Sequence, residues 1–132
     1  MIFVDTSALF SLLDEEDLFH RDAVNYWDAW IDQREIYVST NYVIVETTAL
    51  VQRRLGMAAI QRLMALIVPA IEIRWITPDQ HDKAMQAFLG SARRELSLVD
   101  CSSFVAMRTL NIRRAFSFDT HFEEQGFETN LA

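Results

Sequence analysis

The chain has 132 residues, of which 51% are hydrophobic, and its formal net charge is −7. This length predicts a single domain, residues 1–132, with enough residues to bury a core, and the composition excludes a disordered chain. The acidic balance by itself disfavours nucleic acid as a partner, because contacts to phosphate need basic groups.

The chain carries one cysteine, Cys101, which excludes an internal disulfide and agrees with a reducing, cytoplasmic location. No basic region precedes a long apolar stretch at the N-terminus, so we expect no secretion signal. The longest apolar stretch, residues 63–73, is too short to span a bilayer, so we expect no membrane partner.

Short apolar runs along the chain predict strands, and the residues between them follow helical periodicity. The predicted strands are residues 2–5, 36–39, 71–76 and 114–118, with a weak further strand near Phe127. Strands that alternate with helices imply right-handed crossovers and a mainly parallel sheet. The predicted fold is therefore of the α/β class, with helices on both faces of a four- or five-stranded sheet.

The helices are predicted from apolar spacing and from start and stop signals. One begins after Asp5, and another places Phe19, Ala23, Tyr26, Trp27 and Trp30 on one face. The remaining helices are residues 41–55, which Gly56 ends, residues 57–68, which Pro69 ends, residues 78–95, which Pro78 opens, and residues 100–110. We expect the aromatic face of the second helix to be core, although it could also receive a partner's amphipathic segment through Trp27 and Trp30.

Four acids stand where an acid is costly, namely Asp5, Glu46, Asp100 and Asp119. Asp5 and Asp119 close predicted strands, Asp100 follows Leu98 and Val99, and Glu46 lies at the edge of a helix's buried stripe. Burial of an unpaired carboxylate costs several kcal/mol unless it is compensated, and a shared divalent cation is the economical compensation. Ligands of a parallel sheet bind beyond the carboxyl ends of its strands, where all four acids could meet.

Each acid also has an ordinary explanation. Asp5 and Asp100 could be helix N-caps, Asp119 a turn residue and Glu46 a solvated flank residue. Taken together the acids supply hard oxygen ligands without soft ones, which favours Mg²⁺ or Mn²⁺ over Zn²⁺ or copper. The three histidines show no ligand spacing, and His121 alone lies close to the predicted site.

The basic residues are eleven arginines and one lysine, and several arginines occur in pairs, at residues 53–54, 93–94 and 113–114. Arginine suits bidentate contact with phosphate. These pairs therefore weaken the argument that the negative net charge disfavours a nucleic-acid partner. Ordinary surface arginines at helix ends explain the pairs equally well.

At these residues the chain resembles a PIN-domain ribonuclease of the VapC toxin type, from bacterial or archaeal toxin–antitoxin pairs. Four segments in order carry the resemblance over nearly the whole length: residues 4–9, 40–56, 96–102 and 115–122, followed by Gly126 and Phe127. The resemblance implies a three-layer α/β/α sandwich and a metal-dependent endoribonuclease with Asp5, Glu46, Asp100 and Asp119 as its acidic cluster. It also implies supporting hydroxyls at Ser7, Ser102 and Ser117.

The resemblance further implies an RNA substrate, a cognate antitoxin and a homodimer. Mg²⁺ held by Asp5 and Asp100 is expected to activate a water that Glu46 or Asp119 orients or deprotonates. Some relatives carry a further acid where this chain has His121, which leaves one or two metal ions open.

Three other functions compete with this interpretation. A PIN-type nuclease could process RNA without an antitoxin, and genomic context separates this case from a toxin. A catalytically silent RNA-binding or interaction module is disfavoured by the complete acid set. A metal-dependent phosphotransferase is disfavoured because no second aspartate follows Asp5 closely and no glycine-rich phosphate loop is visible.

Overall fold

Four parallel strands form the sheet in the computed structural model, which describes residues 1–129. The strands are β1 (Ile2–Val4), β2 (Tyr37–Thr40), β3 (Ile71–Arg74) and β4 (Arg114–Phe116). Their order is β3-β2-β1-β4, and every pairing is parallel. The predicted α/β class is confirmed, and the sheet among the described residues has four strands.

The strand β1 is central and buried on both faces, since Ile2, Phe3 and Val4 are each 0% exposed. A parallel strand covered on both sides has no solvent face, so its sequence is continuously apolar instead of alternating. This explains why a run of only three residues was recognisable as a strand.

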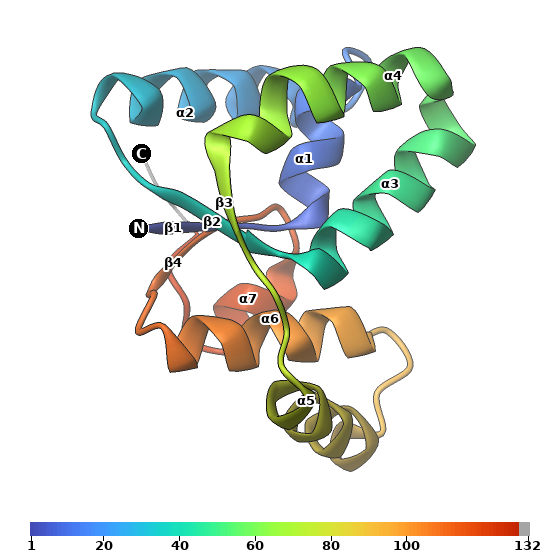
Figure 1. The fold of residues 1–132 in the computed structure, drawn as a ribbon, viewed down its shortest axis with the longest axis vertical. Helices are drawn as coiled ribbons and strands as arrows, with labels where there is room; N and C mark the ends of the chain where they lie inside the picture. The colour runs from blue at the N-terminus through green and yellow to red at the C-terminus, as the bar shows by residue number, and fades with distance from the viewer. Residues whose placement is uncertain (130–132) are drawn as a thin grey trace.

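Helices cover both faces of the sheet (Figure 1). Helices α1 to α4 lie on one side of the strands, and α5, α6 and α7 lie on the other. The helices are α1 (Thr6–Leu13), α2 (His20–Asp32), α3 (Asn41–Leu55), α4 (Met57–Arg62), α5 (Pro78–Ser91), α6 (Leu98–Thr109) and α7 (Thr120–Glu124). This arrangement is the predicted three-layer α/β/α sandwich, and Gly56 ends α3 with a φ of 86°, as its sequence position predicts.

Several element boundaries differ from the prediction. The helix expected over residues 57–68 is α-helical only to Arg62, and a π-helical segment (Leu63–Ile67) and a 3-10 turn (Val68–Ala70) carry the chain into β3. The helix expected to reach residue 95 ends at Ser91, where Ala92 turns into the left-handed region with a φ of 51°. The weak strand near Phe127 is a single bridge between Arg114 and Glu128, and α7 was not predicted.

The aromatic face of α2 is mainly core. Trp30 is 3% exposed and packs edge-on against Phe116, Tyr26 stacks on Trp30, and Trp27 stacks on Tyr37 at 4.3 Å. The suggestion that Trp30 offers an exposed surface to a partner is therefore wrong, because the sheet already occupies this side of the ring. No helix of residues 1–129 combines the length and apolar character that crossing a membrane requires.

Candidate active site

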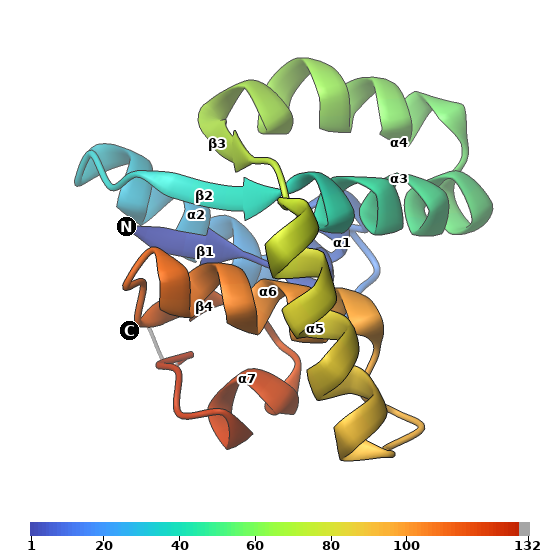
Figure 2. The same cartoon turned by 60° about the horizontal axis from the view of Figure 1, so that its bottom comes forward.

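The chain reverses its direction of winding between β1 and β4. From β1 it moves outward through β2 to β3, and after α5 and α6 it returns to the other side of β1 as β4 (Figure 2). The carboxyl ends of β1 and β4 therefore flank the point where ligands bind in such sheets. Asp5 follows β1 and Asp119 follows β4 by three residues, and each is the N-cap of the next helix. The sequence prediction of capping at Asp5 is confirmed, and capping is compatible with a ligand role.

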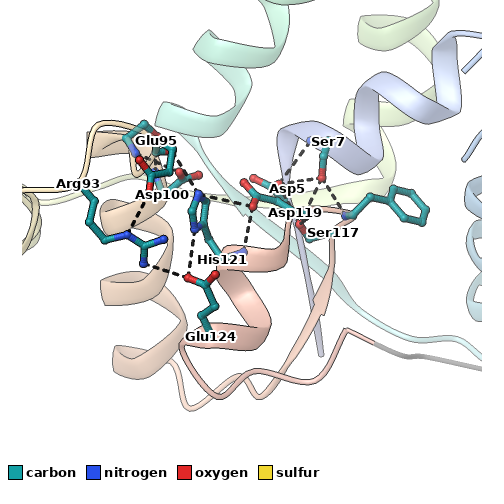
Figure 3. A network of polar contacts seen from close by, with 11 residues as sticks. Asp5, Ser7, Arg93, Glu95, Asp100, Ser117, Asp119, His121 and Glu124 are labelled. Carbon is teal, nitrogen blue, oxygen red and sulfur yellow. Dashed lines mark hydrogen bonds and ion pairs between the residues drawn. The ribbon is translucent and has the colours of Figure 1, made fainter. Parts of the chain in front are cut away.

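Asp5 joins the first and last strands through two serine hydroxyls (Figure 3). Its Oδ2 accepts from Ser7 Oγ at 2.9 Å and from Ser117 Oγ at 3.0 Å. The Ser7 hydroxyl also accepts from the backbone N–H of Phe118, and the Ser117 hydroxyl accepts from the N–H of Asp119, each at 3.0 Å. These contacts fix the Asp5 carboxylate against the β4 end of the sheet, as expected of supporting hydroxyls at Ser7 and Ser117.

Asp5 is only 3% exposed and has an unusual protonation equilibrium. Burial raises the pKa of Asp5 to about 7, and the negative charge of Asp100 adds to this effect, while the bonds from Ser7 and Ser117 oppose it. At neutral pH the group is therefore balanced between its two forms, and a nearby cation would favour the carboxylate.

Asp100 lies at the start of α6, but it is not the cap of that helix. Ser97 is the N-cap: its hydroxyl accepts from the N–H of Asp100 at 3.0 Å, while the Asp100 carboxylate accepts from the N–H of Ser97 at 3.1 Å. The predicted capping role of Asp100 is corrected to the third position of a capping box. The sequence Ser-x-x-Asp at residues 97–100 is the signature of a capping box. It identifies Ser97, which the sequence analysis did not name, as a residue that positions Asp100.

Asp100, Asp119 and His121 form a compact set of ligand atoms. One carboxylate oxygen from each acid and one imidazole nitrogen lie within 4.8 Å of one another. Burial lowers the pKa of His121, but the hydrogen bond to Glu124 and the charges of Asp119 and Asp100 outweigh it, so the pKa is raised overall. Figure 3 shows the imidazole between Asp119 and Glu124, with Asp100 beside it. His121 was placed near the site by its position in the chain, and its side chain belongs to the cluster.

Glu46 approaches the cluster from α3. The first turn of α1 and the second turn of α3 are linked by Thr47, whose hydroxyl donates to Thr6 Oγ1 at 3.0 Å. Thr6 follows Asp5 and Thr47 follows Glu46 in the sequence. Burial raises the pKa of Glu46, a hydrogen bond with Thr6 opposes this rise, and the charges of Asp100 and Asp119 add to it, so the pKa is raised overall. Glu46 is not among the residues whose ligand atoms lie within 4.8 Å of one another, so it borders that set instead of belonging to it.

Ser102 is placed differently from the prediction. Its hydroxyl is fully buried and donates to the backbone carbonyl of Val99 at 2.6 Å within α6. Ser102 therefore stabilises the first turn of α6, the helix that carries Asp100. The hydroxyl that accepts a hydrogen bond from the backbone N–H of Asp100 belongs to Ser97.

One arginine of each pair contacts another side chain of the protein. Arg93 contacts Glu95 at 3.2 Å and Glu124 at 3.0 Å, and Arg114 contacts Glu35 at 2.6 Å. Arg54 lies over the ring of Phe10. These contacts favour intramolecular roles for the three side chains.

The donor set of this site suits a hard divalent cation. Asp100 and Asp119 present carboxylate oxygens and His121 a softer nitrogen, whereas the predicted ligand Asp5 lies outside this set of atoms. Burial raises the pKa of both Asp5 and Asp100. A group of buried acids that repel one another is the environment in which a cation gains most.

Comparison with known proteins agrees with this site. A family model for the PIN domain matches residues 2–128, and the chain belongs to the PIN-domain family. The chain is 32% identical over 128 residues to the 23S rRNA-specific endonuclease VapC20 of two Mycobacterium tuberculosis strains, CDC 1551 / Oshkosh and H37Rv. The match covers 96% of this chain and 95% of each relative. The predicted resemblance to VapC-type PIN domains is confirmed.

The fold is shared as well. The crystal structure of Mycobacterium tuberculosis VapC20, described as a sarcin–ricin loop cleaving toxin, superimposes with a TM-score of 0.87 at 30% identity. The superposition covers 98% of each chain.

Proposed function

We propose that this protein is a metal-dependent endoribonuclease and the toxin of a toxin–antitoxin pair, with residues 1–132 acting as one nuclease domain. The observation that carries the proposal is the compact set of ligand atoms from Asp100, Asp119 and His121, with the buried Asp5 bonded through Ser117 to the β4 end of the sheet beside it. The relatives, which match nearly the full length of the chain, are endonucleases specific for 23S rRNA. Ribosomal RNA is therefore the first substrate to test.

Asp5 and Asp100 would hold Mg²⁺ or Mn²⁺, with Asp119 beside them. When bound there, the cation would supply Lewis acidity toward the phosphoryl group and would lower the pKa of a water molecule. Glu46 accepts a proton from the attacking water, because its raised pKa brings it closer to the value of an effective general base. Asp119 orients that water, and the serines at positions 7 and 117 hold the Asp5 carboxylate in one orientation.

Cleavage of RNA by the purified protein tests this proposal directly. Ribosomes and total RNA are incubated with the protein in Mg²⁺, in Mn²⁺ and in EDTA, and new 5′ ends are mapped. We expect specific cleavage that EDTA abolishes. Asp5→Asn and Asp100→Asn should each lower the rate by at least about 100-fold, since each removes a charge that the transition state uses.

The control is Asp32→Asn, which removes an equal charge at the exposed end of α2. It should cleave like the wild type, and the far-ultraviolet circular dichroism of all variants should match. Full activity of folded Asp5→Asn protein would refute the assigned site.

The toxin role requires a neutralising partner in the same cytoplasm. We propose a cognate antitoxin whose basic side chain enters the acidic cleft, and a homodimer as the toxin's own assembly. Charge complementarity of this kind speeds association, and buried apolar contacts hold the complex.

Growth measurements test the toxin role. Induced expression of the wild-type chain should arrest growth, Asp5→Asn should not, and co-expression of the adjacent gene should restore growth. If the wild-type chain is harmless in a host that lacks the adjacent gene, while purified protein still cuts RNA, the protein is an RNA-processing nuclease without an antitoxin.

A further inference from the structure

We propose that a groove between α3, α5 and α6 is a nucleobase subsite, which holds one unstacked base next to the cleaved phosphodiester. The inference rests on the proposed ribonuclease function and adds the feature of the RNA that the site recognises. The groove has a volume of about 560 Å³ and is lined by Tyr42, Val45, Glu46, His81, Leu98 and Val99. This volume lies in the range of small-molecule sites and exceeds what one base requires.

The groove is continuous with the acidic cluster. Tyr42, Val45 and Glu46 occupy positions i, i+3 and i+4 of α3, so they share one helical face. Glu46 lines the groove and is also within the electrostatic field of Asp100 and Asp119. On the opposite wall, Val99 directly precedes Asp100 in α6. A nucleotide whose phosphate lies at the acids would therefore have this groove beside it, bordered by Glu46 and Val99.

The lining chemistry suits a base better than a charged group. Three aliphatic side chains supply flat apolar contact, and the rings of Tyr42 and His81 meet edge to face at a centroid distance of 5.9 Å. The Tyr42 hydroxyl and His81 Nδ1 are hydrogen-bonded at 2.6 Å, which fixes both rings in the wall. Proteins read single-stranded RNA by stacking splayed bases on such rings and bonding to their edges.

Val45 offers a variant that fills the groove without endangering the fold. Its side chain is 69% exposed, so Val45→Trp adds bulk to the groove and not to the core. Leu66→Trp is the matched control, because Leu66 is 71% exposed and lies on the π-helical segment, outside the groove lining. Both proteins should melt within a few degrees of the wild type.

The experiment uses a short RNA with the sequence of the sarcin–ricin loop, the target of the related toxin, and a series of RNAs that each lack the base of one nucleotide in that loop. We expect the wild type to lose about 10- to 100-fold in kcat/KM at a single position of the series. Val45→Trp should show the same loss on the intact RNA and no further loss when that base is absent, so the two changes should not add. Leu66→Trp should behave like the wild type.

Binding to the same RNAs separates this inference from the proposed function. In an Asp5→Asn background, fluorescence anisotropy should show the same single-position dependence without any cleavage. If that dependence is present but the wild type cuts no RNA, the ribonuclease proposal fails and the base subsite stands. Equal effects of all missing bases overturn the subsite. A changed molar mass of Val45→Trp with unchanged base dependence also overturns it, and assigns the groove to a protein interface.

Discussion

Asp5 shows how one side chain can be costly for the fold and useful for the reaction. It is 3% exposed and in the field of Asp100, and its two serine partners donate to one of its oxygens, Oδ2. Hydrogen bonds from neutral hydroxyls compensate only part of the desolvation of a charge. The desolvation cost that the two hydroxyls leave uncompensated raises the pKa of Asp5. A bound cation would stabilise the carboxylate and lower this pKa again.

The pH dependence of stability follows from this environment. The pKa of Asp5 is about 7 in the folded protein and about 3.8 in the unfolded chain, so between these values the folded state binds more protons. Stability of the metal-free protein should therefore fall as the pH rises from about 4 to about 7, by up to about 4 kcal/mol from this group. Asp5→Asn removes the ionisation, so in EDTA it should equal the wild type near pH 4 and exceed it at pH 8.

Urea unfolding in EDTA at pH 4.5, 6 and 8 measures the effect. Asp32→Asn is again the control, because an exposed carboxylate on α2 carries no comparable desolvation. A wild-type stability that is constant over this range, in parallel with Asp5→Asn, would show that Asp5 ionises without cost.

At the scale of one element, the first turns of α6 contain three serines with different roles. The Ser97 hydroxyl caps the helix, the Ser102 hydroxyl bonds to Val99, and the Ser103 hydroxyl is buried without a partner among the described residues. Such a group loses its water on folding and gains nothing in return.

Ser97 and Ser103 therefore predict opposite results for the same change. Ser97→Ala should destabilise the protein by about 1 kcal/mol, because it removes the cap and one side of the capping box. Ser103→Ala should be neutral or stabilising by up to about 1 kcal/mol, because it removes an unsatisfied hydroxyl at little loss of volume. Chemical denaturation of the two variants measures both, and equal destabilisation would contradict the assignment of the cap.

The elements also show what the sequence could and could not predict. Strong local signals placed β1, the Gly56 stop and the Pro78 start correctly. No local sequence signal marks the π-helical segment after Arg62 or the left-handed turn at Ala92. Both conformations depend on the tertiary packing of the elements that follow them. The five-residue helix α7 is too short for periodicity to reveal it.

The site was predictable as a list of acids but not as an arrangement. Asp5 and Asp119 follow apolar strands, and this pattern alone places them at the same edge of a parallel sheet. The inclusion of His121 and the displacement of Ser102 from the acids depend on side-chain directions that only packing sets. Helical spacing predicted that the face carrying Trp30 is core, but it did not show which element covers that face, so the alternative of a partner surface stayed open until the structure excluded it for Trp30.

For the whole molecule, a net charge of −7 concentrated partly at one site predicts a strong response to metal. An ion that binds only the folded state stabilises it by about 2.7 kcal/mol at 100 times its Kd. For a chain of this length we expect Mn²⁺ to raise the Tm at pH 8 by roughly 10 °C relative to EDTA. The rise should shrink at pH 5, because the carboxylates must be deprotonated to bind.

Thermal melts followed by circular dichroism measure this shift. Asp100→Asn should lose most of the rise in Tm, and Asp32→Asn should retain it. This difference distinguishes binding of Mn²⁺ at the site from general screening of the acidic surface by the salt. Identical melting temperatures in EDTA and Mn²⁺ at pH 8 would mean that no preformed cation site exists.

The pairing of β1 with β4 has a consequence for synthesis. Asp5 accepts a hydrogen bond from Ser117, 112 positions further along the chain, and the same hydroxyl accepts from the N–H of Asp119, so both contacts form only once β4 has paired with β1. A ribosome releases the first strand long before the last, so a growing chain has neither the hydroxyl partner nor the complete set of carboxylates. A chain that stops before β4 therefore lacks both Ser117 and Asp119, and the proposed centre can form only after translation has passed these residues.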